Sequence, residues 1–254
     1  MVKIFPNFEE LNFFAAEQFV EIANKAIEKN GRFTVALAGG STPKSLYQLL
    51  SSDNFKNQIV WKRVFFFFGD ERNVLPDSEE SNFRMANENL FAPLQISDEN
   101  IFRWQTESKD AEKIAGSYEV SLTVFFALSE DELPRFDLIL LGMGDDGHTA
   151  SLFPSTDALK ESKKIVAVNW VEKLNTNRLT FTYPTINNAS NVIFLVSGES
   201  KAEALKEILE GEYQPEKYPA QAVKLKDGEL FWLIDRKAAQ LLSKSTIYYF
   251  PNSI

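Results

Sequence analysis

The sequence predicts an α/β fold, in which a doubly wound, mainly parallel sheet carries helices on both faces. Two observations predict it. Solid apolar runs at 64–68 and 136–141 are typical of strands that are buried on both faces of a parallel sheet. Between such runs lie longer segments whose apolar residues recur at helical spacing. An alternation of strands and helices indicates crossover connections, and these build a parallel sheet.

Each expected element has its own local signal. Asn30-Gly31 is a stop signal for the first helix, Thr42 with Pro43 behind it is typical of a helix start, and Ser81 is a candidate cap. Helices are expected over 8–29, from Thr42 onward, from Ser81 to about 90, over 109–128, over 199–209 and near 236–242. Strands are expected at 33–37, 64–68, 136–141, 179–182, 191–196 and 231–234.

Length and charge narrow the class of protein. A chain of 254 residues suits one α/β domain over 1–254. It carries 27 Lys and Arg against 36 Asp and Glu, a net charge of −9. This balance argues against a nucleic-acid partner or an anionic membrane, because their binding proteins are basic. An anionic ligand would need a few cations gathered in one place.

Cysteine and histidine usage excludes several chemistries. The chain has no cysteine and one histidine. Disulfides, zinc thiolates, cysteine nucleophiles and multi-histidine metal sites are therefore excluded, and we expect no metal and no organic cofactor. The start lacks the apolar run of a signal peptide, and no apolar stretch approaches the ~20 residues of a membrane helix. The expected location is the cytoplasm.

Three polar, glycine-containing segments follow expected strands, at 38–43, 69–73 and 142–151. Ligands of doubly wound sheets bind at such carboxyl ends of strands. In the first segment, AGGSTP, the glycines allow close backbone approach and the helix start offers free N–H groups to an anion. A phosphate cradle and a plain strand-to-helix turn explain this segment equally well.

The second segment, FGDER (68–72), places two acids and a base after an apolar run. From the residues alone, a solvated charged loop is slightly favoured. The third, GMGDDGHTAS (142–151), holds the only histidine, His148. A lone histidine is more often structural than catalytic, but an aspartate beside an imidazole fixes its tautomer and supports its protonated form. Spacing does not decide between Asp145 and Asp146.

Two isolated cations complete the candidates. Arg178 stands just before an expected strand, and Lys201 stands at an expected helix start. A cation at a helix N-terminus opposes the helix dipole, so the place of Lys201 mildly indicates an anion to bind. A surface lysine without a ligand is the alternative.

Five stretches in order resemble the 6-phosphogluconolactonase family, within the group that includes the glucosamine-6-phosphate deaminases/isomerases. They are AGGSTP (38–43), FGDER (68–72) with Ser81-Asn82, GMGDDGHTASLFP (142–154), NRLTFTYPTINNA (177–189) and SGESKAEAL (197–205). The deaminase branch carries a catalytic glutamate where this chain has Phe153, and usually an aromatic residue where it has Arg72. Both departures favour the lactonase branch. Asp145 departs from the usual lactonase pattern, in which proline or a small residue is commoner.

The resemblance implies a Rossmann-like α/β fold of the glucosamine-6-phosphate isomerase/lactonase type. It also implies hydrolysis of 6-phospho-D-glucono-1,5-lactone to 6-phospho-D-gluconate, a step of the oxidative pentose phosphate pathway. His148 would then be the general base that activates water, with Asp146 orienting it. Arg72 and the backbone N–H groups of Gly39 and Gly40 would stabilise the oxyanion.

The substrate phosphate would bind Gly39, Gly40, Ser41, Thr42, Arg178 and Lys201, and Asp70 and Glu71 are possible substrate contacts. Two other functions stay open. One is deamination and isomerisation of glucosamine-6-phosphate, and the other is non-catalytic sensing of a sugar phosphate. The expected partner is a small sugar-phosphate lactone, and the expected state is a monomer or a homodimer.

Overall fold

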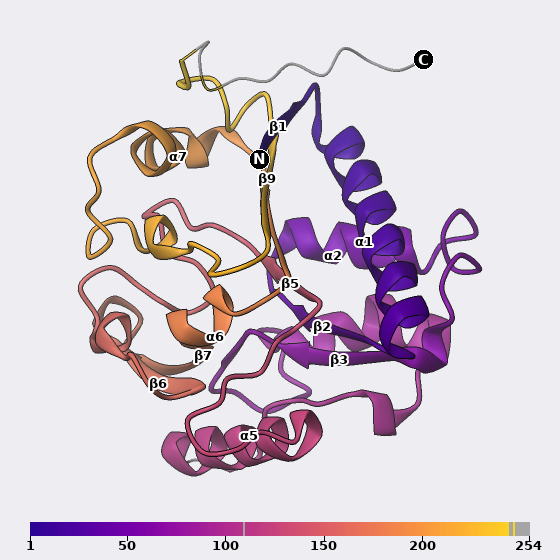
Figure 1. The fold of residues 1–254 in the computed structure, drawn as a ribbon. Coiled ribbons are helices and arrows are strands. Elements are labelled where there is room, and N and C mark those ends of the chain that lie inside the picture. The colour runs from indigo at the N-terminus through magenta and orange to yellow at the C-terminus, as the bar shows by residue number, and fades with distance from the viewer. Residues whose placement is uncertain (109, 244–245, 247–254) are drawn as a thin grey trace.

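The computed structural model describes residues 1–108, 110–243 and 246, and its centre is a six-stranded sheet (Figure 1). All neighbouring strands of this sheet are parallel, in the order β1-β9-β8-β5-β2-β3. The strands are β1 (Val2–Phe5), β2 (Phe33–Leu37), β3 (Val64–Phe68), β5 (Leu138–Leu141), β8 (Asn191–Val196) and β9 (Glu229–Asp235). The expected mainly parallel, doubly wound sheet is therefore confirmed.

Helices cover both faces of this sheet. In Figure 1, α1 (Phe8–Asn30) and α2 (Ser41–Leu50) lie on one side, and α6 (Tyr183–Asn187) and α7 (Ala202–Glu210) lie on the other. A continuous helical segment packs against α2, made of α3 (Asn82–Ala86), a π-helical turn (Asn87–Phe91) and α4 (Ala92–Leu94). Short 3₁₀ turns lie at Trp61–Arg63, Asp98–Asn100, Asp157–Lys160, Glu172–Leu174, Glu199–Lys201 and Pro219–Ala222.

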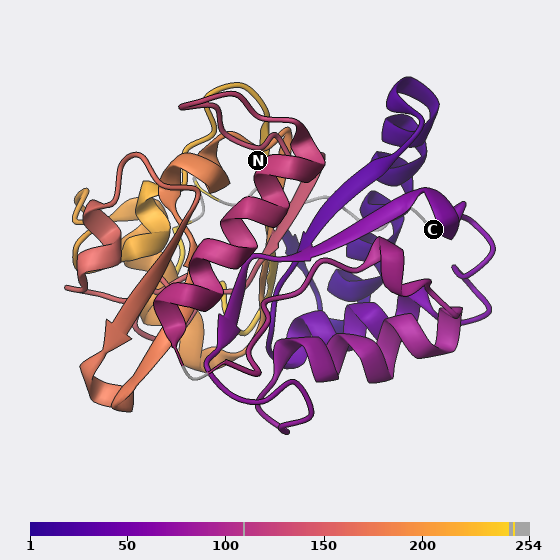
Figure 2. The ribbon, with the colours of Figure 1, turned by 90° about the horizontal axis from the view of Figure 1, so that it is seen from below.

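A second, three-stranded antiparallel sheet has the order β4-β7-β6. Its strands are β4 (Asp70–Arg72), β7 (Thr176–Phe181) and β6 (Val166–Val171). Helix α5 (Ala111–Phe126) lies along β6 and β7, as Figure 2 shows. The sequence did not predict this sheet. Three charged residues in a row have no apolar alternation, so β4 becomes a strand only because β7 pairs with it.

The phenylalanines of β3 form the centre of an aromatic core. Phe66, Phe67 and Phe68 are at most 1% exposed. The Phe67 ring stacks on Phe102 at 4.7 Å and meets Phe136 edge-on at 5.2 Å. Such pairs contribute beyond the area that they bury. The run at 65–68 is therefore core, as its composition predicted.

Local start and stop signals were largely confirmed. The N–H of Gly31 (φ 73°) bonds to the Ile27 carbonyl and ends α1, and the Ser81 side chain accepts from the Arg84 N–H and caps α3. Helix α2 begins earlier than expected. Its N-cap is Gly40, and no side chain caps it, so Thr42 lies inside the helix. Within the helix expected at 109–128, Lys109 lies outside the described residues.

The helix expected near 236–242 is wrong. Residues 236–242 form turns that follow β9. The Asp235 carboxylate accepts from the Ala238 N–H at 2.8 Å, and it also accepts from Ser197 Oγ at 2.5 Å and from the Gly198 N–H. The bond to the Ala238 N–H has the spacing of a helix N-cap, but the chain that follows forms turns. The bonds from Ser197 and Gly198 hold Asp235 against the segment after β8.

Two glycines give a matched test of the backbone. A Cβ on either Gly31 or Gly116 would meet no atom within 4 Å, but only Gly31 has a positive φ. We expect Gly31→Ala to lower the free energy of unfolding by about 1 kcal/mol, because alanine is strained in the left-handed region. Gly116→Ala, in the middle of α5, should raise it by about 0.5–1 kcal/mol. Urea unfolding followed by circular dichroism measures both, and equal signs would contradict the assignment.

Candidate active site

A cavity of about 360 Å³ opens at the carboxyl ends of the central strands. Strands β2 and β5 are neighbours. Within this sheet the next strand after β2 is β3, on one side, and the next strand after β5 is β8, on the other. Ligands of open α/β sheets bind at this kind of switch point. Of the predicted site residues, the cavity wall contains Gly39, Gly40, Asp70, Arg72, His148 and Arg178.

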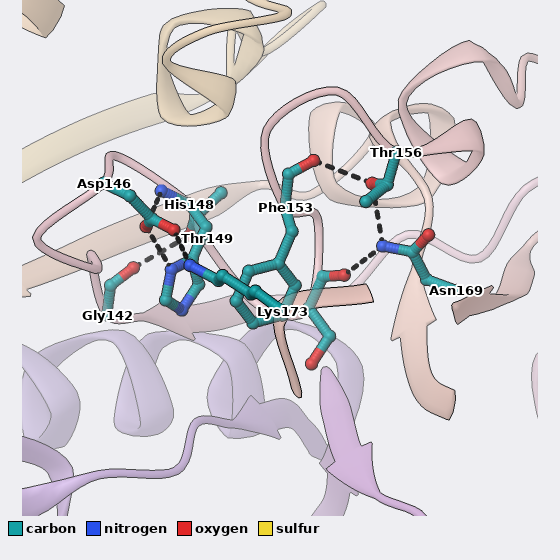
Figure 3. A network of polar contacts seen from close by, with 9 residues as sticks. Gly142, Asp146, His148, Thr149, Phe153, Thr156, Asn169 and Lys173 are labelled. Atoms are coloured by element: carbon teal, nitrogen blue, oxygen red, sulfur yellow. Dashed lines mark hydrogen bonds and ion pairs between the residues drawn. The ribbon is translucent and has the colours of Figure 1, made fainter. Parts of the chain in front are cut away.

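The loop after β5 positions His148 against Asp146 (Figure 3). Asp146 Oδ1 accepts a hydrogen bond from His148 Nδ1 at 2.5 Å and from the His148 backbone N–H at 3.1 Å. Asp145 is exposed. The structure therefore places Asp146 on the imidazole, a choice that spacing left open. Thr149 Oγ1 donates to the Gly142 carbonyl at 2.9 Å and closes the loop at its base.

Gly144 makes this close approach possible. A Cβ at this position would lie 2.0 Å from His148 Nδ1 and 2.6 Å from an Asp146 carboxylate oxygen. Its N–H donates to the His148 carbonyl at 2.8 Å. Only glycine lets the backbone pack directly on the histidine–aspartate pair.

The Asp146 carboxylate stays ionised next to the imidazole. Partial burial raises its pKa, but the hydrogen bonds from His148 and Lys173 outweigh this and hold the pKa well below the usual range. Because a carboxylate only accepts, its hydrogen bond with His148 Nδ1 requires a proton on that nitrogen, so the neutral tautomer that fits this contact has its lone pair on Nε2. This arrangement suits a histidine that accepts a proton at Nε2.

Phe153 and Lys173 also belong to the cavity wall. The Phe153 ring stacks on the His148 ring at 4.1 Å, with 24° between the planes. Lys173, in the 3₁₀ turn between β6 and β7, donates to Asp146 Oδ2. Lys173 was not among the site residues predicted from the sequence. The one local sign of a role at the site was its place in a polar turn, five residues before Arg178.

The pairing of β4 with β7 separates the three charged residues of β4. Asp70, Glu71 and Arg72 pair with Thr180, Leu179 and Arg178. Since successive side chains of a strand point to opposite faces, Asp70 and Arg72 face the cavity and Glu71 faces away from it. A solvated loop, slightly favoured from the residues alone, is therefore wrong for this segment.

The same register sets two arginines side by side on the cavity wall. Arg72 and Arg178 are directly opposite each other, and the Arg72 guanidinium donates to the Glu80 carbonyl. Partial burial and the neighbouring Arg72 charge lower the pKa of Arg178. Within the described residues, the buried Nε of Arg178 has no hydrogen-bond partner. Two adjacent cations with a free donor form a site suited to an anion.

Glu71 is part of the scaffold and does not line the cavity, in contrast to the expectation that it contacts substrate. Its side chain is 2% exposed. The carboxylate accepts from the backbone N–H groups of Arg72, Asn82 and Phe83 at 2.8–2.9 Å and from Ser81 Oγ at 3.3 Å. It therefore ties β4 to the start of α3. Burial raises the pKa of Glu71 despite these donors.

Asp70 is held from two sides. Asp70 Oδ2 accepts from Ser151 Oγ at 2.7 Å, and Asn82 Nδ2 donates to the Asp70 carbonyl at 3.0 Å. Asn82 Oδ1 packs on Gly39, where a Cβ would lie only 2.0 Å away. Asn82 thus joins the AGGSTP segment to β4, which places Asp70 and Gly39 on one wall.

Ser41, Thr42 and Lys201 are not part of the cavity wall. Ser41 and Thr42 form the first turn of α2, directly after the lining residues Gly39 and Gly40. Lys201 ends the 3₁₀ turn that follows β8. Their expected contact with a phosphate stays a prediction.

The described residues contain neither a metal-ligand cluster nor a membrane-spanning helix. In residues 1–108, 110–243 and 246, no three His, Cys, Asp or Glu side chains are grouped so that they could hold a metal ion. In the same part of the chain, no helix is long and apolar enough to cross a membrane.

This fold and site define a known class of protein. Residues 6–232 match the family of glucosamine-6-phosphate isomerases/6-phosphogluconolactonases, and the chain belongs to that family. Within it, the 6-phosphogluconolactonase of Synechocystis sp. is 44% identical over 218 residues, which are 86% of this chain and 88% of that protein. The 6-phosphogluconolactonase of Chlamydia pneumoniae is 38% identical over 225 residues, 87% of this chain and 82% of that protein.

Solved structures of family members have the same fold as this chain. The 6-phosphogluconolactonase of Trypanosoma brucei superposes with a TM-score of 0.86 at 31% identity, covering 96% of this chain and 98% of that one. A monomeric glucosamine-6-phosphate deaminase superposes with a TM-score of 0.77 at 25% identity, covering 94% and 99%. The fold is therefore shared by both branches of the family.

The scaffold role of Glu71 can be tested by stability. Glu71→Gln keeps the shape but replaces one accepting oxygen with a donor, so buried N–H groups lose their partner. We expect the free energy of unfolding to fall by about 2–3 kcal/mol, measured by urea unfolding. The control is Glu17→Gln on the exposed side of α1, which should change it by less than about 0.5 kcal/mol. Equal, small effects would mean that Glu71 does not anchor β4.

Proposed function

We propose that this chain hydrolyses 6-phospho-D-glucono-1,5-lactone to 6-phospho-D-gluconate, with His148 as the general base. One observation carries the proposal: His148, held at Nδ1 by Asp146, lines a cavity that it shares with Arg72 and Arg178. His148 and Asp146 together can transfer a proton, and the two arginines can bind an anionic substrate. The 6-phosphogluconolactonases at 38–44% identity support this substrate.

The proposed reaction needs only water and the residues at the site. Nε2 of His148 takes a proton from water as the oxygen attacks the lactone carbonyl carbon. The carbonyl oxygen becomes an oxyanion, for which Arg72 and the N–H groups of Gly39 and Gly40 are the proposed donors. As the tetrahedral intermediate collapses, the bond to the ring oxygen breaks and His148 returns its proton to that oxygen. Asp146 stabilises the imidazolium between the two transfers.

The phosphate is the proposed ligand of Arg178, whose buried Nε has no partner within the described chain. Ser41, Thr42, the N-terminus of α2 and Lys201 are the further proposed contacts. Lys201 follows β8 and Gly39 and Gly40 follow β2, so all lie at the carboxyl edge of the sheet. Asp70 lines the cavity and is a proposed contact for the sugar hydroxyls.

Phe153 favours lactone hydrolysis over deamination of glucosamine-6-phosphate. The resemblance implies a catalytic glutamate at this position in the deaminase branch, and here an apolar ring stacks on the general base instead. A non-catalytic sensor would need the arginines but not a paired histidine and aspartate. Hydrolysis is therefore the function that the site supports best.

The test is a rapid-mixing assay of lactone loss against its spontaneous hydrolysis, with ammonia release from glucosamine-6-phosphate measured in parallel. We expect fast lactone loss and no ammonia. Ammonia release would assign the chain to the other branch. Binding of the sugar phosphate without turnover of either substrate would make it a sensor.

Removal of the histidine should abolish catalysis. His148→Ala should lower lactone turnover by about 10²- to 10⁴-fold, because general-base transfer contributes that much and the chain has no second histidine. Circular dichroism should show an intact fold. A variant that keeps more than about a tenth of the activity would contradict the general-base role.

The pH dependence should contain one rising limb, in the range in which an imidazole loses its proton. Asp146 adds no second limb there, since its pKa lies well below the usual range and it stays ionised. The initial rate, corrected for spontaneous alkaline hydrolysis, gives the profile. His148→Gln should remove the limb, and a limb that persists would belong to another group.

The phosphate contacts should act on binding more than on turnover. A charge-assisted hydrogen bond contributes roughly 1.5–3 kcal/mol, so Arg178→Ala and Lys201→Ala should each raise KM by about 10- to 150-fold. The phosphate lies far from the reacting carbonyl, so kcat should change less. Both variants should hydrolyse unphosphorylated gluconolactone as well as the unsubstituted protein does. Equal losses on both lactones would remove these residues from the phosphate site.

A further inference from the structure

We propose that Lys173 is a positioning residue, which fixes the Asp146 carboxylate against His148 and favours the neutral form of the imidazole by its charge. The effect of Lys173 on catalysis rests on the proposed function. The contacts among Asp146, His148 and Lys173 are the same for any reaction at this cavity.

The geometry divides one carboxylate between two donors (Figure 3). Asp146 Oδ1 faces His148 Nδ1 at 2.5 Å, and Asp146 Oδ2 accepts from Lys173 Nζ. With both oxygens held, the carboxylate cannot rotate away from the imidazole without breaking an ion pair. Lys173 comes from the turn between β6 and β7, 27 residues further along the chain, so the second sheet holds the catalytic loop of the first.

The Phe153 ring supports both ends of this arrangement. His148 stacks on it at 4.1 Å, and Lys173 Nζ lies 5.0 Å from its centroid. A cation over an aromatic face is attracted by the ring. The ammonium therefore has two partners, Asp146 and Phe153, and each of them also contacts the histidine.

Lys173 lies in the wall that separates two cavities. Lys173 and Phe153 line the active-site cavity, and with Asp146 they also line a neighbouring cavity of about 720 Å³. The Lys173 side chain is 53% exposed and the Asp146 side chain 25%. An ion pair so exposed adds little to stability. Its consequence is therefore expected in the titration of His148 and not in folding.

The charges around His148 determine in which direction the loss of Lys173 should move the titration of His148. Asp146 favours the protonated imidazole, and Lys173 opposes it through the same carboxylate. Among the described residues, Asp70, Arg72 and Arg178 are further titratable groups that line the cavity with His148. Asp145 is exposed in the same loop as His148, and Tyr218 packs on Gly147. Replacement of Lys173 by a neutral residue leaves the Asp146 charge uncompensated, so His148 should keep its proton to a higher pH.

The single histidine makes this directly measurable in the free protein. The ring C–H resonances of His148 report its titration with no other histidine present. Lys173→Met should move the midpoint upward by about 0.5–1 pH unit, the effect of removing one nearby charge from a partly solvated site. Lys173→Arg keeps the charge and should restore the original midpoint to within about 0.2 unit.

Lys25→Met is the matched control. Lys25 also pairs with one acidic side chain, Glu21, at 2.6 Å. It borders a cavity with Asn191 and Glu229, the first residues of β8 and β9, and so lies at the opposite end of the sheet from His148. Its removal should leave the midpoint unchanged.

The same variants are then assayed for lactone hydrolysis. We expect the rising limb of the pH–rate profile to move with the His148 midpoint in Lys173→Met and to return in Lys173→Arg. An unchanged midpoint in Lys173→Met overturns the proposal, and a raised KM with an unchanged midpoint would make Lys173 a substrate contact instead. If the protein hydrolyses no lactone, the proposed function fails, but the resonance titration still decides the role of Lys173.

Discussion

The hydrogen bonds of Gly69 join the two sheets, and the site depends on this junction. The Gly69 N–H donates to the Leu37 carbonyl of β2 at 3.0 Å, and its own carbonyl accepts from the Phe181 N–H of β7 at 2.7 Å. The next residue begins β4, whose register with β7 is thereby fixed. A shift of one residue would exchange the faces of β4, because side chains alternate along a strand. Glu71 would then point into the cavity, and Asp70 and Arg72 would point into the scaffold.

Apart from His148, the charged residues of the cavity wall come from the second sheet. Strand β4 brings Asp70 and Arg72, β7 brings Arg178, and the turn between β6 and β7 brings Lys173. The parallel sheet supplies glycine-containing loops that line the same cavity and lie against the His148–Asp146 pair. Rigid strands thus set the positions of the side chains, and short loops complete the cavity.

Local charge overrides the global charge of this protein. The chain carries a net charge of −9, which repels an anionic substrate at long range. At the cavity, however, Arg72 and Arg178 are adjacent. In the proposed reaction Arg72 meets the oxyanion and Arg178 the phosphate of one substrate, and these negative charges offset the repulsion between the two arginines. An acidic protein can therefore bind a sugar phosphate with only a few cations, provided that the strand register holds them together.

The sequence by itself determined the parallel sheet, most of its strands and the segments that border the cavity. These features depend on local signals: apolar runs for β2, β3 and β8, helical spacing and Gly31 for α1, and polar segments directly after strands. The family resemblance rested on the same segments and named His148, Asp146, Arg72 and Arg178. Each of these signals lies within about twenty residues of chain, so it can be read without knowing what packs against it.

Only the tertiary structure decided which groups meet. It made β4 a strand, turned Glu71 into the scaffold, placed Asp146 and not Asp145 against His148, and brought Lys173 to Asp146. Residues 236–242 form turns where a helix was expected, and Asp235 before them bonds to the segment after β8. The physical cause is that these outcomes depend on pairing register and on donor–acceptor contacts between segments distant in the chain. Periodicity along a single segment carries no information about them.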